Sequence, residues 1–107
     1  MSNEEVETII GDDIIFKGNL RFGKTLQIDG QFKGTIESDG KLIIGEKGKL
    51  NGDININSLV VKGELHGNVD ASKSIKIIKN GKISGDIKTP DIEIESGAKF
   101  IGNCVMN

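Results

Sequence analysis

The stretch Lys41–Ile56, KLIIGEKGKLNGDINI, contains one full unit of a repeat that runs along nearly the whole chain. It reads apolar-x-apolar and then, after a short Gly-rich segment, apolar-x-Gly-x-apolar. A fixed period over most of a chain indicates a solenoid, in which each unit buries its apolar face against its neighbours. The second phrase returns, at spacings of 16, 18, 15, 18 and 17 residues, around six glycines: Gly18, Gly34, Gly52, Gly67, Gly85 and Gly102.

Apolar residues inside each repeat recur at every second position, which is the period of a β-strand and not of a helix. In residues 50–56, Leu, Gly, Ile and Ile alternate with Asn, Asp and Asn. A coil of about 17 residues is too short for a strand–helix–strand unit, but it fits two or three short strands joined by tight corners. We therefore predict an all-β, single-domain parallel β-helix with about six coils of about 17 residues. The apolar-x-apolar phrase supports this period, at Leu26/Ile28, Leu42/Ile44, Leu59/Val61, Ile75/Ile77 and Ile92/Ile94.

The composition fits a narrow solenoid core. The 107 residues contain 15 glycines, one proline and no Tyr or Trp, as expected where corners need glycine and the core stacks Ile, Leu and Val. The net charge of −2 argues against nucleic acid as a partner, and there is no basic run, zinc spacing or aromatic cluster typical of such proteins.

The chain has one cysteine and no apolar run long enough for a signal peptide or a membrane-spanning helix. We therefore expect a soluble, cytoplasmic protein without an internal disulfide. Cys104 is expected to be a small buried hydrophobe rather than a reactive thiol. The reason is that it takes the repeat position held elsewhere by Leu20, Ile36, Ile54, Val69 and Ile87.

Two segments are expected along the chain. Residues 1–7 are polar and acidic, and we expect them to form a disordered tail, followed by a β-helix domain over residues 8–106. Residues 1–13 hold five acidic and no basic side chains, which is unlike a membrane anchor.

Three features invite a functional interpretation, but each also has a structural one. His66 takes a position that should face solvent, without a second histidine or a nucleophile placed beside it. Gly45–Gly48 superficially resembles a phosphate loop but lacks the following Lys-Ser/Thr, so corner glycines are favoured. If the coils stack in register, the residues after the repeat glycines form a polar column. Because only two of them are acids, we interpret them as turn residues rather than as a cation site. These residues are Asn19, Thr35, Asp53, Asn68, Asp86 and Asn103.

Apolar residues gather where a solenoid would need a cover. We expect an interface at the C-terminal end, formed by Phe100, Ile101, Val105 and Met106, and another at the N-terminal end. In a monomer, Phe16 and Phe100 would instead plug the two ends. The N-terminal interface is expected to contain Ile9, Ile10, Ile14 and Phe16, and a small lateral patch to contain Ile43 and Val60.

With this register assigned, the chain resembles the bactofilins over about residues 8–106, essentially its whole length. Single coils are weak signals, but their order and the Lys-Thr-Pro phrase are fairly specific. The residues that carry the resemblance are Thr8–Gly11, Leu26–Ile36, Val60–Gly67, Gly85–Pro90 and Gly97–Gly102.

The resemblance implies a bacterial cytoskeletal protein with a right-handed, triangular β-helix and no cofactor. It implies polymerisation end to end, without nucleotide, into non-polar filaments, with Phe100 matching an aromatic residue that matters for assembly. It also implies a scaffold for cell-wall-modifying enzymes that affects cell shape at the inner membrane. Ser2–Glu7 does not resemble the membrane-targeting stretch of some members, which counts against direct membrane binding and favours recruitment through an inner-membrane partner.

Two other classes of function remain open. A monomeric β-helix that serves as a passive binding scaffold differs from a filament former only in its ends. A hexapeptide-like acyltransferase would need a strict six-residue rhythm and a usable histidine, and a carbohydrate-active β-helix would need clustered acids or arginines. The period near 17, the single histidine and the single arginine favour a structural protein over either enzyme.

Overall fold

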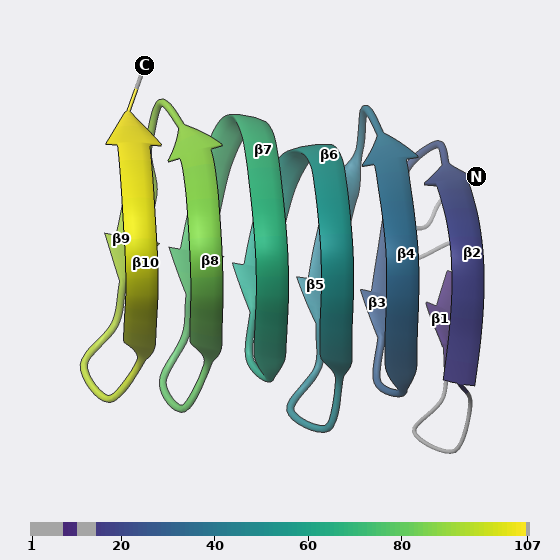
Figure 1. The fold of residues 1–107 in the computed structure, drawn as a ribbon, viewed down its shortest axis with the longest axis horizontal. Helices are drawn as coiled ribbons and strands as arrows, with labels where there is room; N and C mark the ends of the chain where they lie inside the picture. Colours follow the sequence, from purple (N-terminus) through teal and green to yellow (C-terminus); the bar gives the residue numbers. More distant parts are fainter. Residues whose placement is uncertain (1–7, 11–14, 107) are drawn as a thin grey trace.

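A computed structural model describes residues 8–10 and 15–106 and shows a rod of stacked β-coils (Figure 1). The long strands lie side by side along the rod, with β2 at one end and β10 at the other. The strands are β1 (Thr8–Ile10), β2 (Ile15–Phe22), β3 (Thr25–Ile28), β4 (Gln31–Ser38), β5 (Lys41–Ile44), β6 (Lys49–Val61), β7 (Glu64–Ile77), β8 (Lys82–Thr89), β9 (Ile92–Ile94) and β10 (Lys99–Met106).

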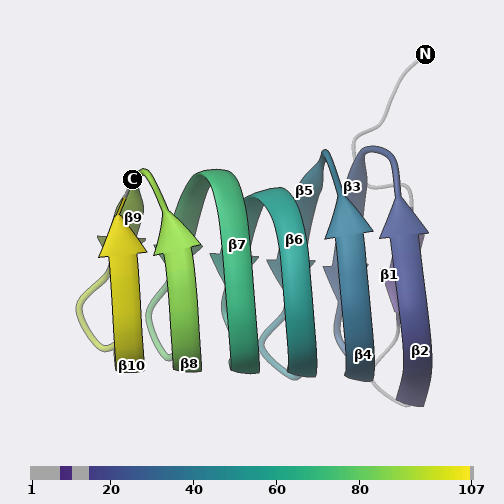
Figure 2. The same ribbon diagram turned by 45° about the horizontal axis from the view of Figure 1, so that its top comes forward.

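Every described strand pair is parallel, and each strand pairs with the equivalent strand of the next coil. One row of pairs joins the long strands, and a second row of shorter segments passes behind it, as a rotated view makes plain (Figure 2). The chain forms about five turns of about 17 residues. The prediction of an all-β parallel solenoid is therefore confirmed.

The core consists of columns in which equivalent residues of successive coils stack on one another. In the middle coils the side chains of these columns are at most 4% exposed. Apart from Phe32, each column contains aliphatic residues of similar size, so each coil presents nearly the same inner surface to the next. The columns are Leu26/Leu42/Leu59/Ile75, Ile28/Ile44/Val61/Ile77, Phe32/Leu50/Leu65/Ile83 and Ile36/Ile54/Val69/Ile87.

The glycines of the repeat also form a column, for a backbone reason. Gly52 has φ of 141°, a region that residues with a side chain rarely adopt. A Cβ on Gly52 would overlap the carbonyl oxygen of Gly34 in the preceding coil, and the same holds at Gly67, Gly85 and Gly102. Glycine is therefore required by close approach of the coils as well as by φ.

The shorter glycine-containing segments are tight turns. In Gly45–Gly48 the N–H of Gly48 donates to the carbonyl oxygen of Gly45 at 2.9 Å, and the N–H of Gly45 donates to Ile28 at 2.8 Å. The equivalent bond in a later coil joins Gly81 to Ile78 at 2.7 Å. The N–H groups of Gly45 and Gly48 are therefore occupied by the fold and are not free to bind a phosphate.

One buried polar residue explains the Lys-Thr-Pro phrase. Thr89 is fully buried, in a column whose other middle members are Ile56 and Ala71. Its hydroxyl donates to the carbonyl oxygen of Asp91 at 3.0 Å and accepts from the N–H of Asp91 at 3.3 Å, around Pro90. The buried hydroxyl is therefore satisfied within its own corner.

Candidate functional site

The C-terminal end exposes residues that belong to the core columns. Ile94 continues the column of Ile77 and is 45% exposed, and Met106 continues the column of Thr89 and is 57% exposed. Phe100 is half-buried. These side chains lie at inward positions, but no described coil covers them.

Cys104 was predicted to be buried, and that prediction is wrong. Its register partner is Ile87, so it does occupy the predicted aliphatic column, but it is exposed. The column position is inherited from the repeat, whereas burial requires a further coil on the far side. The sequence analysis did not include Ile94 in the C-terminal interface for the same reason. The repeat predicts its column, but not that the column is uncovered there.

Two of the predicted C-terminal interface residues lie on the side of the rod rather than in the core columns. Ile101 pairs with Ser84 and Val105 pairs with Lys88, both at outward positions, and they are 56% and 54% exposed. The long strands of all the other coils carry polar residues at these two positions. Ile101 and Val105 therefore flank the exposed end instead of forming its centre.

The N-terminal end is described in part. Phe16 is half-buried and stacks on Phe32, with ring centroids 5.1 Å apart and an angle of 9° between the planes. The backbone register pairs Ile9 with Gln27 and Ile10 with Ile28, and the predicted interface residue Ile14 lies outside the described residues. Ile15, which the sequence did not single out, is 66% exposed at an outward position beside Gln31.

Among the described strands, both ends of the sheet have an unpaired edge. β10 is the last strand of the hydrogen-bonded path and pairs with β8, whereas β2 pairs with β4 and β1 with β3. An unpaired edge presents a row of N–H and C=O groups that can pair with another chain. At the C-terminal end this edge adjoins the exposed apolar columns.

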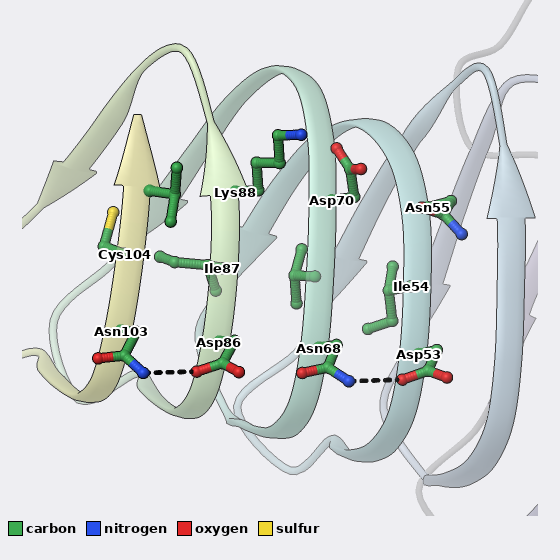
Figure 3. A pocket seen from close by; sticks show the side chains of 12 residues that line it. Asp53, Ile54, Asn55, Asn68, Asp70, Asp86, Ile87, Lys88, Asn103 and Cys104 are labelled. Carbon is green, nitrogen blue, oxygen red and sulfur yellow. Dashed lines mark hydrogen bonds between the residues drawn. The ribbon is translucent and has the colours of Figure 1, made fainter. Parts of the chain in front are cut away.

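The residues after the glycines do form a polar column, but the prediction that they are turn residues is wrong, because they lie within the long strands (Figure 3). The amide of Asn68 donates to Asp53 Oδ1 at 3.1 Å, and that of Asn103 donates to Asp86 Oδ1 at 3.1 Å. Carboxylate and amide groups thus alternate over the last four long strands, where they form two hydrogen-bonded pairs. Within the described ranges, no group of three or more His, Cys, Asp or Glu side chains is placed to hold a metal ion.

His66 lies at an outward position, as predicted. Its side chain is 43% exposed, and its Nε2 atom lies 3.9 Å from Glu64 Oε1. In register it lies between Asn51 and Ser84, and in the part of the chain that the structure describes no hydrogen bond joins it to Ser84. The geometry does not assemble a nucleophile and a base.

The predicted lateral patch exists as a register pair. Ile43 and Val60 are neighbours in adjacent coils, and both are half-buried. Gln27 and Lys76 occupy the same column on either side of them. The apolar area is therefore small and bounded by polar side chains.

A rod of parallel coils, with apolar columns and a strand edge open at its end, defines the class of protein as a structural β-solenoid with a surface for stacking. Residues 8–105 match the family model described as Bactofilin, polymer-forming cytoskeletal. The match covers nearly the whole chain, so this protein belongs to the bactofilin family and is a polymer-forming cytoskeletal protein.

A solved structure agrees with this assignment. The fold is similar to that in a cryo-EM reconstruction of Thermus thermophilus bactofilin double helical filaments, with a TM-score of 0.87 and 29% sequence identity. The alignment covers 94% of this chain and 99% of that one. The sequence has no significant match among curated proteins.

No described helix is long and apolar enough to cross a membrane.

Proposed function

We propose that this bactofilin assembles end to end, without nucleotide, into non-polar filaments that scaffold cell-shape or cell-wall machinery. The observation that carries this proposal is the exposed C-terminal ending of the core columns. Ile94, Cys104 and Met106 lie at positions that are closed in the middle of the rod and open at its end. No nucleotide-binding geometry is required, because stacking buries apolar surface and pairs strand edges without a chemical step.

Stacking of a second rod would supply what the last coil lacks. The free edge of β10 would gain a strand partner, and the inward side chains would gain a covering layer. Fully burying an Ile or Met side chain contributes about 1.5–3 kcal/mol, and the partly exposed side chains here would contribute a fraction of that each. Several such residues at one end are enough to favour a stable contact.

Contacts between like ends make the filament non-polar. A C-terminal end that meets a second C-terminal end forms an isologous contact, and alternation with a contact between N-terminal ends gives an open polymer. Phe100 and Met106 would lie in the centre of the C-terminal contact, and Ile101 and Val105 at its margin. The N-terminal contact would involve Phe16, with Ile9, Ile10 and Ile14 as further proposed members.

Negative-stain electron microscopy and sedimentation of the purified chain, without nucleotide, test this proposal. We expect long thin filaments from the wild-type chain, and loss of filaments with retained β-structure from Phe100→Arg. A matched control is Ser84→Arg, which places the same charge at an outward position of β8, one coil away. If Phe100→Arg polymerises like Ser84→Arg, the C-terminal contact is wrongly assigned; if the wild-type chain stays monomeric, self-assembly is not its activity.

We also propose that the rod is right-handed and that its turns, about five in number, join about six coils, each with one long strand. Crossovers between parallel strands are right-handed in nearly all known cases. Six members of the glycine repeat, Gly18 to Gly102, support the number of coils. A cryo-EM map at a resolution that shows side chains would fix the hand, and a left-handed path would exclude this winding.

The cellular role belongs to the same proposal. The filament would act in the cytoplasm, held at the inner membrane by a membrane partner, and would position cell-wall-modifying enzymes. The Ile43 and Val60 patch is a candidate for a secondary lateral contact. If Ile43→Asn and Val60→Asn variants show unchanged filaments and unchanged recruitment in cells, the patch has no such role.

A further inference from the structure

The long strands carry a small groove near the N-terminal end of the rod, where β2, β4, β6 and β7 lie side by side (Figure 1). The volume of the groove is about 210 Å³. Its described lining residues include three lysines, one histidine and two side-chain amides, and none of them is an acid. We call it the basic groove, and its polar members are Lys17, Gln31, Lys33, Lys49, Asn51 and His66.

The stacking of the coils brings the three lysines of the groove together. Lys17 and Lys33 are register partners in adjacent coils, and Lys33 is in turn the register partner of Asn51. Lys49 precedes Asn51 by two residues in the same strand, so both side chains leave the outer face of the sheet. Parallel strands lie about 4.8 Å apart, which is less than the length of an extended lysine side chain. The three ammonium groups can therefore converge on one small ion.

The positive charge of the groove is only partly balanced within the molecule. Glu64 lies beside the groove, with its carboxylate oxygens 3.9 Å from Lys49 Nζ and 3.9 Å from His66 Nε2. Among the described residues, no ion pair joins an acid to Lys17 or Lys33, and both of these side chains are exposed. Like charges at adjacent register positions repel each other, so an anion between these two lysines would be stabilised by both.

We propose that the basic groove binds a phosphate group, either of a soluble phosphate compound or of a phospholipid headgroup. Lysine ammonium groups bind phosphate as point charges, and the side-chain amides of Gln31 and Asn51 can donate further hydrogen bonds. A phosphate group accepts hydrogen bonds through several oxygens and from several directions, which matches donors that are spread over adjacent coils. All the lining residues belong to one chain, so this proposal does not depend on end-to-end assembly.

The size and lining of the groove favour a phosphate group over a larger anion such as a nucleotide. Pockets for larger ligands typically measure about 300–1,000 Å³, whereas this groove measures about 210 Å³. Phe32 is the one aromatic residue of the described lining, and it is only 2% exposed, so its ring is not available for stacking on a base. Ile15, at one side of the groove, is 66% exposed and is placed to contact the apolar part of a lipid.

Binding of inorganic phosphate, measured by equilibrium dialysis at constant ionic strength, is the first test. Lys17→Gln/Lys33→Gln removes two ammonium groups and keeps polar side chains at these exposed positions. We expect it to weaken phosphate binding about tenfold or more, because two charge-assisted contacts are lost. The matched control is Lys82→Gln/Lys99→Gln, which removes another pair of register-partner lysines from the long strands, outside the groove. This control should bind phosphate like the wild type.

Vesicle flotation distinguishes the two sources of the phosphate group. The wild-type chain and both double variants are mixed with phosphatidylglycerol vesicles and, in parallel, with uncharged phosphatidylcholine vesicles. Flotation with phosphatidylglycerol alone, lost in the Lys17/Lys33 variant and kept in the Lys82/Lys99 control, would identify a lipid headgroup as the ligand. Binding of inorganic phosphate without flotation would identify a soluble phosphate compound.

Three results would overturn the proposal. The first is a wild-type chain that binds neither inorganic phosphate nor phosphatidylglycerol vesicles. The second is a Lys17/Lys33 variant that binds like the wild type. The third is an equal loss of binding in the two double variants, since net charge rather than the groove would then explain the effect. Circular dichroism should show unchanged β-structure in both variants, because all four lysines lie at outward positions of the long strands.

Discussion

Ile77 and Ile94 occupy the same column one coil apart, yet Ile77 is 0% exposed and Ile94 is 45% exposed. Ile87 and Cys104 show the same contrast between the middle of the rod and its C-terminal end. The positions are equivalent in the repeat, and the difference between them is whether another coil lies on the far side. The C-terminal end of the described rod thus exposes side chains of the same kind as those that form its core.

The glycine column gives the largest expected effect, because there the middle coils tolerate no side chain. Gly52→Ala would place a Cβ on the carbonyl oxygen of Gly34, and we expect a loss of more than about 4 kcal/mol in the free energy of unfolding. Gly18→Ala is the control, with φ of 131° but with its nearest atom, Phe16 Cε1, at 4.0 Å. It should cost about 1–3 kcal/mol, from backbone strain alone. Chemical denaturation measures both, and equal losses would show that backbone strain, not contact between coils, requires the glycines.

The aliphatic column next to the glycines compares the two regions directly. Ile87→Ala removes a side chain that is 2% exposed and should cost about 2–5 kcal/mol. Cys104→Ala, in the same column but exposed, should change stability by less than about 0.5 kcal/mol in a monomer. Both are best measured in the Phe100→Arg background, which we expect to be monomeric. A large effect of Cys104→Ala in that background would mean that the last coil is covered within the single chain.

Thr89 tests how much a buried polar group contributes to the stability of the rod. Thr89→Val keeps the shape and removes the hydroxyl that bridges the N–H and C=O of Asp91, so we expect a loss of about 1–3 kcal/mol. Thr89→Ser keeps the hydroxyl and should keep the corner in place, at the smaller cost of one methyl group. Thermal unfolding distinguishes them, and a Val variant as stable as the wild type would show that Pro90 alone holds the corner.

The sequence determines which residues share a column, because a strand period of two and a coil of about 17 residues are local regularities. For that reason the columns of Leu50, Gly52 and Ile54 were predictable by aligning the copies of the repeat. Exposure at the ends was predictable only in part: Met106 was expected at an open end, whereas Cys104 was expected to be buried because it takes the same repeat position as Ile87. Thr89 was also hidden, because a hydroxyl reads as a surface group unless the backbone of its corner is known.

The side positions of the last coil were only partly predictable. Ile101 was predicted to share an end surface with Phe100, but the register places it in a column whose other members are polar. Its direction separates it from Phe100, since adjacent residues of a strand point to opposite faces. The predicted end surface therefore combined Phe100, which points toward the core, with Ile101, which lies on the side of the rod.

The smallest effect is expected on the outer surface of the first coils, where stability should depend little on any single contact. Arg21 Nη2 lies 3.2 Å from Glu37 Oε2, but the two side chains are 83% and 51% exposed, so water and salt screen their attraction. Arg21→Ala should lower the free energy of unfolding by less than about 0.5 kcal/mol, and the difference should vanish at high salt. Chemical denaturation at two salt concentrations measures this difference. Lys76→Ala, which removes a second exposed ion pair, that of Lys76 with Glu93 at 3.4 Å, should behave in the same way. A loss above about 1 kcal/mol that persists in salt would mean that the aliphatic part of Arg21 packs on the coil, and that the outer surface contributes to the rod's stability as the columns do.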